Sequence, residues 1–575
     1  MRLLTVDEAA YLLGESRRKI RRWCASGVLP ASWTESGWLI QDARIEGSGY
    51  LQHRAPDIET VPDFERALLQ LELTDFIEIW FPDILRFQDK LSDRGKLLEN
   101  VREKFDAGII DPVVEIEIPK AEFFARTGHL LTLEDRIAYH AVVGTFAEKL
   151  DDTLMGVVFS SRYNSQEKNR QTEKLTRLAR KENTLLRKGV RQWKKWTKYV
   201  RASARAGNDW LVKTDLSSYF DCIRHEILLG ELSMIGVSKD IRCALGAYLS
   251  AWSNAPGQGL PQGPDVSRIL GNFYLAPVDA AMIREGFKYS RYMDDVRIVG
   301  QTRDELTRAM RRFGAECRQR GLIVSSVKTV VLHGDAARKV DLDSEREIAQ
   351  YLLDTRQGSR AVRLLRKILE DSLAEKGRVD ARGARFSLWR LAFLRDENVC
   401  KLVLDNLEVL APVASIVGDY LSGYIDKGYV RDGLTEYLSN RDVYRDDYLV
   451  AYLFAAMLEF SGDMPKLWVD SARNLTKDRH KPDYLRGVAA NVLALGGLPE
   501  DLAWLRNEAR RETGTGLQRA YATGLRRVGH LDDSTCSVLT SRSIGMAQAV
   551  EYLKSAARLP SLVRPYTTVP IKRSS

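Results

Sequence analysis

Tyr292-Met293-Asp294-Asp295 joins two segments of strand-like composition, residues 287–291 and 296–299. A tight turn between short strands confines two adjacent carboxylates, whose like charges repel each other. A divalent cation is the usual compensation, and hard oxygen ligands of this type suit Mg²⁺. The tetrapeptide alone is equally consistent with an acidic hairpin turn, so its meaning depends on the rest of the chain.

Three further segments carry residues suited to nucleotide chemistry. Residues 211–221 read as an apolar strand that ends on Asp215, where this acid can share a metal with Asp294. Residues 259–272 are a Gly/Pro-rich loop entering an amphipathic helix, and such a backbone can approach a nucleotide and a template closely. Residues 321–329 place Lys328 after a short strand.

These elements, in this order and spacing, resemble the palm of reverse transcriptases. The strand-end acid, the Leu-Pro-Gln-Gly loop, Tyr-Met-Asp-Asp and the late lysine match its successive motifs. The resemblance covers roughly residues 110–340 and implies polymerase fingers and palm within residues 55–340. A fingers pattern similar to that of intron and retron enzymes agrees, at Ile118-Pro119-Lys120, Arg126, Glu134-Asp135-Arg136 and Phe159-Ser160-Ser161-Arg162.

The resemblance implies RNA-directed DNA synthesis from dNTPs by two-metal nucleotidyl transfer, in which the protein positions groups and neutralises charge. Asp215 and Asp294 would bind two Mg²⁺ ions, with Mn²⁺ as the alternative ion. The Leu216 carbonyl would be a further metal ligand, and Asp295 would complete the acidic cluster. Lys328 would protonate or neutralise the leaving pyrophosphate, although a solvated strand-end lysine is the simpler alternative.

Five residues are expected to contact the dNTP. Lys120 and Arg126 would grip the triphosphate, because cationic groups match phosphate oxygens. Gln262 and Gly263 would face the incoming nucleotide. Phe220 lies where the family keeps a bulky side chain under the sugar, which would exclude a 2′-hydroxyl. The alternatives are a core role for Phe220 and a surface or ion-pair role for Arg126.

Charge is unevenly distributed along this chain of formal net charge +9. Basic residues dominate residues 162–205, and Trp193, Trp196 and Tyr199 are interleaved near the end of that segment. Basic surfaces bind phosphates and aromatic rings stack on bases, so the segment is predicted to bind nucleic acid. The alternative is a solvated helix whose aromatic side chains lie in the core. The predicted contact residues are Arg162, Lys194, Lys195 and Lys198.

The first fifty residues form a separate unit. Residues 5–8 match a capping box that opens a short helix, and a second helix is expected over residues 17–25. Residues 27–30 and 38–40 can form a small wing. The pattern resembles the winged helix-turn-helix of excisionase and MerR-type DNA binders, with Arg17 and Arg21 suited to nucleic-acid contacts. Such folds also dock proteins.

Helical-period segments follow one another after about residue 340, separated by short polar or Gly/Pro breaks. They predict an α-solenoid similar to HEAT repeats over residues 341–560, followed by a tail at residues 561–575. The expected fold class is α+β right-hand polymerase fingers and palm, then an all-α HEAT-like solenoid, with a small N-terminal winged helix-turn-helix. The clearest segments are residues 361–373, 385–394, 413–425, 448–460, 486–495 and 502–510.

A palm followed by helical repeats resembles the bacterial abortive-infection and other defence-associated reverse transcriptases of the unknown-group lineage. This implies antiphage defence, with an RNA template or associated non-coding RNA, or with priming from a tyrosine of the chain itself. Two alternatives stay open: a retroelement polymerase of the intron or retron type, and an inactive nucleic-acid-sensing scaffold, against which the intact acidic residues argue. The candidate priming tyrosines are Tyr424, Tyr429, Tyr437, Tyr444 and Tyr566.

Cysteine usage and hydropathy bear on location. The six cysteines are scattered, without zinc-binding spacing or a disulfide framework. No apolar signal stretch and no run of membrane-spanning length is present. These features predict a cytoplasmic protein that binds no membrane, and the resemblance implies a bacterial protein that binds dNTPs, RNA and a DNA product. A solenoid surface is also consistent with a homo-oligomer or a complex with another protein.

Overall fold

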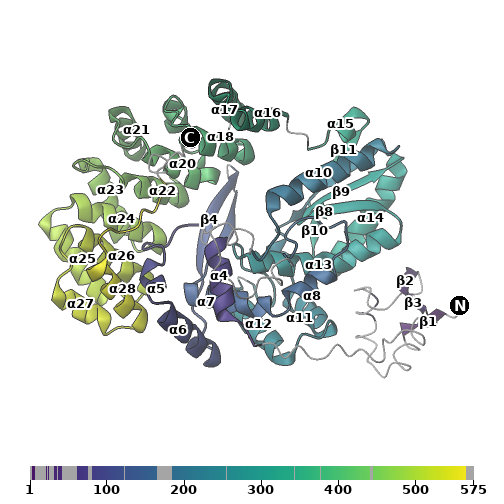
Figure 1. Cartoon of the computed structure of the whole chain (residues 1–575), viewed down its shortest axis with the longest axis horizontal. Coiled ribbons are helices and arrows are strands. Elements are labelled where there is room, and N and C mark those ends of the chain that lie inside the picture. Colours follow the sequence, from purple (N-terminus) through teal and green to yellow (C-terminus); the bar gives the residue numbers. More distant parts are fainter. Residues whose placement is uncertain are drawn as a thin grey trace. The chain divides into compact units, whose positions relative to one another are not determined.

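The computed structural model describes residues 3–6, 21, 24, 31–34, 37–41, 61–74, 80–121, 124–164, 184–253, 255–341, 344–375, 377–440 and 445–564. The chain divides into two compact units (Figure 1). The first consists of Met1–Ile79, Leu98–Val114 and Leu131–Leu342, and the second of Trp80–Leu97, Glu115–Leu130 and Asp343–Ser575. Within the described ranges, no helix is long and apolar enough to cross a membrane.

A four-stranded antiparallel sheet is the centre of the first unit. Its strands are β6 (Trp210–Thr214), β8 (Lys288–Tyr292), β9 (Asp295–Gly300) and β11 (Val330–His333), in the order β11-β6-β9-β8. Tyr292 pairs with Asp295 across the β8–β9 hairpin, and Thr214 of β6 pairs with Val296. A short ladder joins β7 (Leu216–Ser217) to β10 (Ile323–Val324). The predicted strand before Asp215 and the hairpin around residues 293–294 are therefore confirmed.

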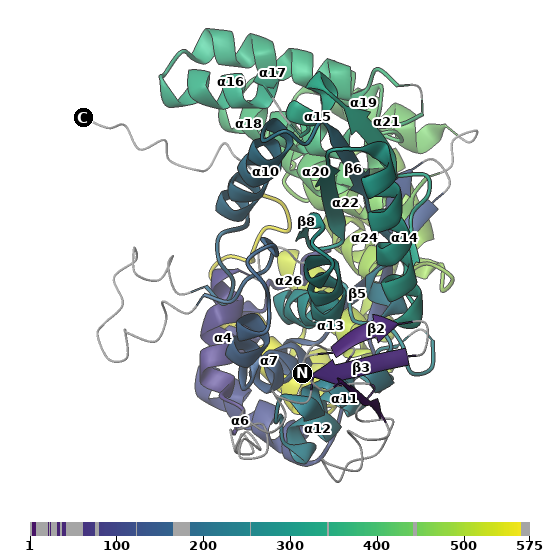
Figure 2. The same ribbon diagram turned by 90° about the vertical axis from the view of Figure 1, so that its right-hand side faces the viewer.

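Helices cover both faces of this sheet. Successive side chains of a strand point to opposite faces, and those of β9 are buried on both. Helix α10 (Gly189–Arg205) packs on one face, where the Trp196 Nε1–H donates to the Ser290 hydroxyl at 3.0 Å. Helices α13 (Asp265–Arg284) and α14 (Arg303–Gln319) pack on the other, and the neighbouring Tyr289 hydroxyl donates to Asp279 of α13 at 2.9 Å. Figure 2 shows the strands between α10 and α14.

The remaining helices of the first unit surround this centre. Helix α7 is buried along nearly its whole length and packs against α4, α12 and α13. The bounds are α4 (Phe64–Leu73), α6 (Arg94–Asp106, which begins in the second unit), α7 (Leu133–Gly144), α8 (Ala147–Asp152), 3-10 helix η3 (Phe220–Cys222), α11 (His225–Met234), α12 (Lys239–Ala251) and α15 (Asp335–Arg338).

The N-terminal segment contains a three-stranded antiparallel sheet in the order β1-β3-β2. Strands β2 (Ala31–Thr34) and β3 (Gly37–Gln41) form a hairpin that agrees with the predicted wing at residues 38–40. Strand β1 (Leu3–Thr5) ends at Thr5 and Val6 is helical, which agrees with the helix start predicted at residues 5–8. Residues 7–20 and 25–30, which include the second predicted helix start and part of the wing, lie outside the described residues.

The second unit is mainly helical, and each predicted helical segment beyond residue 360 is confirmed. One row of consecutively packed helices is α18, α20, α22, α24, α26 and α28, and a second row includes the pairs α19–α21, α21–α23 and α25–α27. The bounds are α5 (Gln88–Leu91), α16 (Ser344–Asp354), α17 (Gly358–Ser372), α18 (Ala381–Phe393), α19 (Cys400–Leu404), η4 (Ala411–Val413), α20 (Ala414–Ser422), α21 (Gly428–Ser439), α22 (Asp447–Met457), α23 (Lys466–Lys477), α24 (Asp483–Gly496), α25 (Pro499–Arg511), α26 (Thr515–Arg527), α27 (Asp533–Thr540) and α28 (Ile544–Ser555).

Two segments predicted to belong to the fingers are part of this helical unit: residues 80–97, and most of the hairpin of β4 (Val114–Ala121) and β5 (Phe124–Leu130). A buried charge network explains the attachment of residues 80–97. The Arg519 guanidinium of α26 donates to both carboxylate oxygens of Asp83, at 2.6 and 2.9 Å, and of Asp89, at 2.8 and 2.7 Å. The hydroxyls of Tyr448 and Tyr452 also donate to the Trp80 carbonyl, at 3.0 and 2.7 Å. The domain boundaries therefore differ from the predicted ones.

Candidate active site

The two-residue turn between β8 and β9 presents Asp294. Met293, the first residue of the turn, is buried and has a left-handed backbone, with φ at +61°. That conformation is uncommon for a residue with a side chain and indicates that the surrounding structure holds the turn. Burial and the neighbouring charge of Asp215, which also forms a hydrogen bond with it, raise the pKa of the Asp294 carboxyl to about 7.

Asp215 follows the last residue of β6 and meets Asp294 from the adjacent strand. Its carbonyl accepts a hydrogen bond from the Ser325 amide at 2.8 Å, which fixes the strand end. Its side-chain Oδ2 forms an ion pair with the Lys328 Nζ. Although partial burial opposes it, the hydrogen bond and charge of Asp215 raise the pKa of Lys328, so this side chain stays cationic. The structure thus brings together Asp215, Asp294 and Lys328, as the sequence predicted.

Asp295 is the first residue of β9. Its carboxylate pairs with Arg297, whereas that of Asp294 forms a hydrogen bond with Asp215. The Asp295 Oδ1 is 3.6 Å from an Nη of Arg297, a fully buried arginine that also pairs with Asp341 at 2.9 Å. Burial raises the pKa of Asp295, although Arg297 opposes the shift. Among the described residues, no three Asp, Glu, His or Cys side chains form a group that could hold a metal ion. The role of Asp295 as a further metal ligand therefore stays a prediction.

The Asp215–Asp294 pair nevertheless suits a divalent cation. Two carboxylates within hydrogen-bonding reach of each other cannot both ionise at low cost, and burial together with this repulsion raises the pKa of Asp294. A hard cation such as Mg²⁺ relieves the repulsion and typically completes its coordination with water and substrate phosphates. The Leu216 backbone is paired with Val324 in the β7–β10 ladder, and the role of its carbonyl as a ligand stays a prediction.

The predicted nucleotide-binding residues Phe220, Gln262 and Gly263 also converge. The Leu260 amide donates to the Phe220 carbonyl at 2.9 Å, and the Gln262 side-chain amide donates to Asp221 at 2.9 Å. Gly263 has φ of +135°, a conformation suited to glycine. Phe220 is half-buried, and Gly271 of α13 lies against its ring, since a Cβ at Gly271 would be 3.3 Å from Phe220 Cε1.

Lys120 and Arg126 lie on β4 and β5 of the second unit. Lys120 is exposed, whereas the Arg126 guanidinium lies 4.7 Å from the centre of the Trp80 ring. Burial, helped by the nearby positive charge of Arg385, lowers the pKa of Arg126. Their binding of a triphosphate stays a prediction.

The basic helix α10 combines an exposed cationic face with a buried aromatic one. Lys194, Lys195 and Lys198 are exposed, in agreement with a nucleic-acid-binding surface. Trp196 is fully buried, and its ring and that of Trp193 pack against Tyr292 with centroid separations of 5.7 and 5.0 Å. For Trp196 the core alternative is therefore correct, and this side chain supports the turn that carries Asp294.

The other predicted nucleic-acid contacts differ in outcome. The Arg162 guanidinium forms a two-point ion pair with Asp151, at 2.6 and 3.1 Å, and also donates to the carbonyls of Met155 and Val158. These contacts brace a loop and do not support nucleic-acid binding by Arg162. Arg21 is a helical residue with an exposed side chain, and Arg17 lies outside the described residues.

Sequence reasoning missed a buried polar network behind the acidic turn. It consists of Arg291, Asp279 and Asn272, all of which have a relative exposure of 0%. The sequence did contain a signal for this network. Side chains two residues apart in a strand lie on the same face, so Arg291 is buried if Tyr289 faces the core. A buried arginine needs an acidic partner, and Asp279 lies within the apolar helix at residues 265–284.

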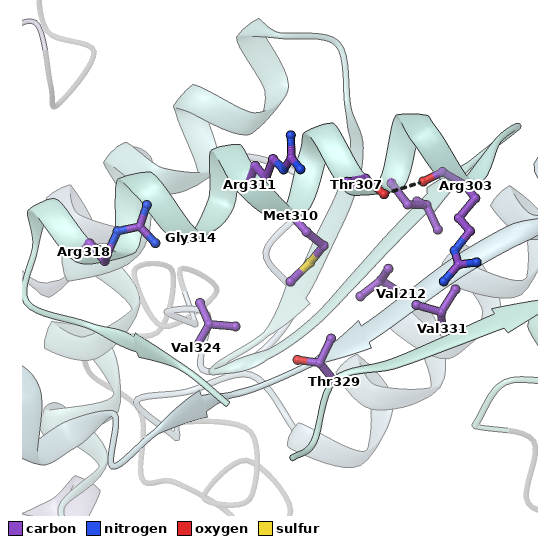
Figure 3. Close-up of a pocket in the computed structure, with 11 residues that line it drawn as sticks. Val212, Arg303, Thr307, Met310, Arg311, Gly314, Arg318, Val324, Thr329 and Val331 are labelled. Atoms are coloured by element: carbon purple, nitrogen blue, oxygen red, sulfur yellow. Dashed lines mark hydrogen bonds between the residues drawn. The ribbon is translucent and has the colours of Figure 1, made fainter. Parts of the chain in front are cut away.

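A groove of about 500 Å³ separates α14 from the strands β6, β10 and β11 (Figure 3). Its apolar lining includes Val212, Met310 and Val324, and three arginines of α14 flank it. Thr329 also lines the groove, next to Lys328 in the chain. Asp215, Asp294 and Lys328 are not among the residues that line the groove, so the groove is separate from the acidic pair.

Comparisons with known proteins agree with this geometry. Residues 161–365 match the family model "Reverse transcriptase (RNA-dependent DNA polymerase)", and residues 3–46 match a "Helix-turn-helix domain" model. The chain is also similar to the "Retron Ec86 reverse transcriptase" of Escherichia coli, with 22% identity over 139 residues, which are 24% of this chain and 43% of that protein. The similarity thus spans less than half of the length of that relative.

Proposed function

We propose that this chain is an RNA-directed DNA polymerase that extends DNA by nucleotidyl transfer from dNTPs. The observation that carries the proposal is the pairing of Asp215 and Asp294 at adjacent strand ends, with Lys328 beside them. These residues lie inside the segment that matches the reverse transcriptase model. A polymerase needs such a cluster, because phosphoryl transfer depends on positioning and charge neutralisation.

Each residue of the site has a role in this proposal. Asp215 and Asp294 would hold two Mg²⁺ ions, or Mn²⁺ in their place, which would polarise the reacting phosphate and the attacking hydroxyl. Lys328, released from Asp215 when the ions bind, would donate a proton to the leaving pyrophosphate. The half-buried Phe220 would support the sugar and exclude a 2′-hydroxyl, while Gln262 and Gly263 would face the base and phosphates.

Primer extension tests the proposal. Purified chain is supplied with Mg²⁺, dNTPs and a DNA primer annealed to RNA, beside Asp294→Asn and the control Asp335→Asn. Asp335 is an exposed acid of the same unit, paired with Lys339 at 3.2 Å and not part of the site. Extension by the wild type and the control but not by Asp294→Asn supports the proposal, and equal extension by all three contradicts it.

We further propose that the enzyme acts in bacterial antiphage defence, in the cytoplasm, with a HEAT-like helical unit that binds partners or a second copy of the chain. The rows of packed helices in the second unit support the helical-repeat part of this proposal. Priming from a tyrosine remains part of the proposal: Tyr429 is 45% exposed, Tyr437 is buried, and Tyr444 and Tyr566 lie outside the described residues. Label from a dNTP that stays on the protein after nuclease digestion would identify such priming.

A retroelement polymerase is the second candidate, and the similarity to a retron reverse transcriptase favours it. In that case the template would be a defined RNA that copurifies with the chain. Sequencing of the DNA product distinguishes this candidate from template-independent synthesis, because a retroelement enzyme yields a copy of that RNA. The inactive scaffold predicts that Asp294→Ala leaves the biological activity unchanged.

A further inference from the structure

Arg291 lies directly behind the acidic turn and is fully buried. All five of its side-chain N–H donors have acceptors. Nε and Nη2 donate to the two carboxylate oxygens of Asp279, each at 2.7 Å. Nη1 donates to the Asn272 side-chain oxygen at 2.7 Å, and Nη2 also donates to the Asn272 carbonyl at 2.9 Å. The second Nη1 donor reaches the Met293 carbonyl at 3.3 Å.

Arg291 stays cationic in this buried position. Burial alone would lower the pKa of Arg291, but the charge and hydrogen bonds of Asp279 raise it. A buried pair of this kind adds little net stability compared with apolar packing, and removal of one partner is costly. Its presence below the turn therefore calls for a role other than stability.

Asn272 extends the network to a third segment. Its side-chain amide donates to the carbonyls of Ser160 at 2.7 Å and Ser161 at 3.3 Å. At the preceding residue, Gly271, an added Cβ would lie 3.3 Å from Phe220 Cε1, so the absence of a side chain leaves room for the ring. Helix α13 thus accommodates Phe220 at Gly271 and is joined to the acidic turn through Asn272 and Arg291.

We propose that Arg291 is a positioning residue for Asp294. By donating to the Met293 carbonyl, its guanidinium holds Met293 in the left-handed conformation that directs Asp294 toward Asp215. The inference rests on the proposed polymerase function. The network of Arg291, Asp279 and Asn272 thereby determines the distance between the Asp215 and Asp294 carboxylates. This distance in turn determines their affinity for a divalent cation.

Arg291→Lys tests this, because lysine keeps a charge for Asp279 but lacks the fork that reaches Asn272 and Met293. The expected result is a fall in kcat of ~10- to 100-fold, since small misplacements of catalytic groups have effects of this size. The KM for dNTP should change by less than about twofold, and the Mg²⁺ concentration for half-maximal rate should rise. Asn272→Ala, which leaves the Arg291–Asp279 pair intact, should shift kcat and the Mg²⁺ requirement in the same direction.

Tyr289→Phe is the matched control. It removes the hydroxyl that donates to Asp279 at 2.9 Å and leaves the groups of Arg291, Asn272 and Met293 that form the network in place. It should lower Tm without changing kcat or the Mg²⁺ requirement. If kcat falls in proportion to Tm in all three variants, or if Arg291→Lys has normal kcat and Mg²⁺ dependence, the positioning role is wrong.

Calorimetric titration of Mg²⁺ into the protein without nucleic acid separates this inference from the proposed function. Weaker Mg²⁺ binding by Arg291→Lys than by Tyr289→Phe supports the positioning role, even if the wild type extends no primer. Equal Mg²⁺ binding by the two variants contradicts it. Failure of the wild type to extend any primer contradicts the polymerase function alone.

Discussion

Mg²⁺ binding at the acidic pair should depend steeply on pH. The pKa of Asp294 is raised to about 7 by burial and by Asp215, and Mg²⁺ binds the ionised carboxylate. Lowering the pH from 8 to 6 therefore makes the cation compete with a proton. A carboxyl of ordinary pKa, near 4, would be ionised throughout this range and would show no such competition.

The expected change follows from the fraction of Asp294 that is ionised. With a pKa of about 7, this carboxyl is about 90% ionised at pH 8 and about 10% ionised at pH 6. The apparent Kd for Mg²⁺ should therefore rise about tenfold, or ~1.4 kcal/mol. The raised pKa of Asp295 acts in the same direction.

Isothermal titration of MgCl₂ into the nucleic-acid-free protein measures this change. Titrations in two buffers of different ionisation enthalpy also count the protons released, and the count should approach one at pH 6. Asp294→Asn should bind Mg²⁺ weakly with little pH dependence. A wild-type Kd that changes less than twofold between pH 6 and 8 would refute the reasoning.

The same shift has a consequence for stability. Because the folded pKa of Asp294 lies above its unfolded value, the metal-free folded state binds more protons than the unfolded state between about pH 4 and 7. The free energy of unfolding should therefore fall as the pH rises through this window. Saturating Mg²⁺ should remove much of this loss at pH 8.

Three further outcomes are expected. Phe220→Ala should raise rNTP use relative to dNTP use by about tenfold or more in single-nucleotide addition, since loss of a steric contact changes discrimination by ~1–3 kcal/mol; an unchanged ratio would assign the ring to the core. Arg519→Met should destabilise the second unit by ~3–5 kcal/mol, because it leaves two buried carboxylates without their cation, and a thermal melt with an unchanged Tm would contradict this. Replacing the exposed lysines of α10 with glutamine should lower RNA affinity and reduce the salt dependence of log K by about two, whereas unchanged binding would exclude this surface; these lysines are Lys194, Lys195 and Lys198.

The elements predicted best from the sequence are those whose signals are local. An apolar run that ends on Asp215, and a hairpin around Met293 and Asp294, are specified by neighbouring residues, and both are present. The helical period after residue 340 also identified the helices of the second unit correctly. In each case the pattern of side chains within one element was sufficient.

Features that depend on distant partners were not predictable in this way. Arg519 meets Asp83 across 436 residues, and no local pattern indicates that residues 80–97 belong with the C-terminal helices. Arg162 belongs to a basic stretch, yet its partner Asp151 precedes that stretch and removes it from the predicted surface. The basic, aromatic-rich sequence of α10 predicted base stacking, with a core position as the alternative, and did not indicate that Trp196 would pack against Tyr292.

The most direct test of the central claim is templated copying by the purified chain. A DNA primer is annealed to two RNA templates of different sequence, extended with dNTPs and Mg²⁺, and the products are sequenced beside those of Asp294→Asn. The account predicts that the wild-type products are complementary to each template and that the variant makes none. Products whose sequence does not follow the RNA, or equal synthesis by Asp294→Asn, would contradict RNA-directed synthesis at this site.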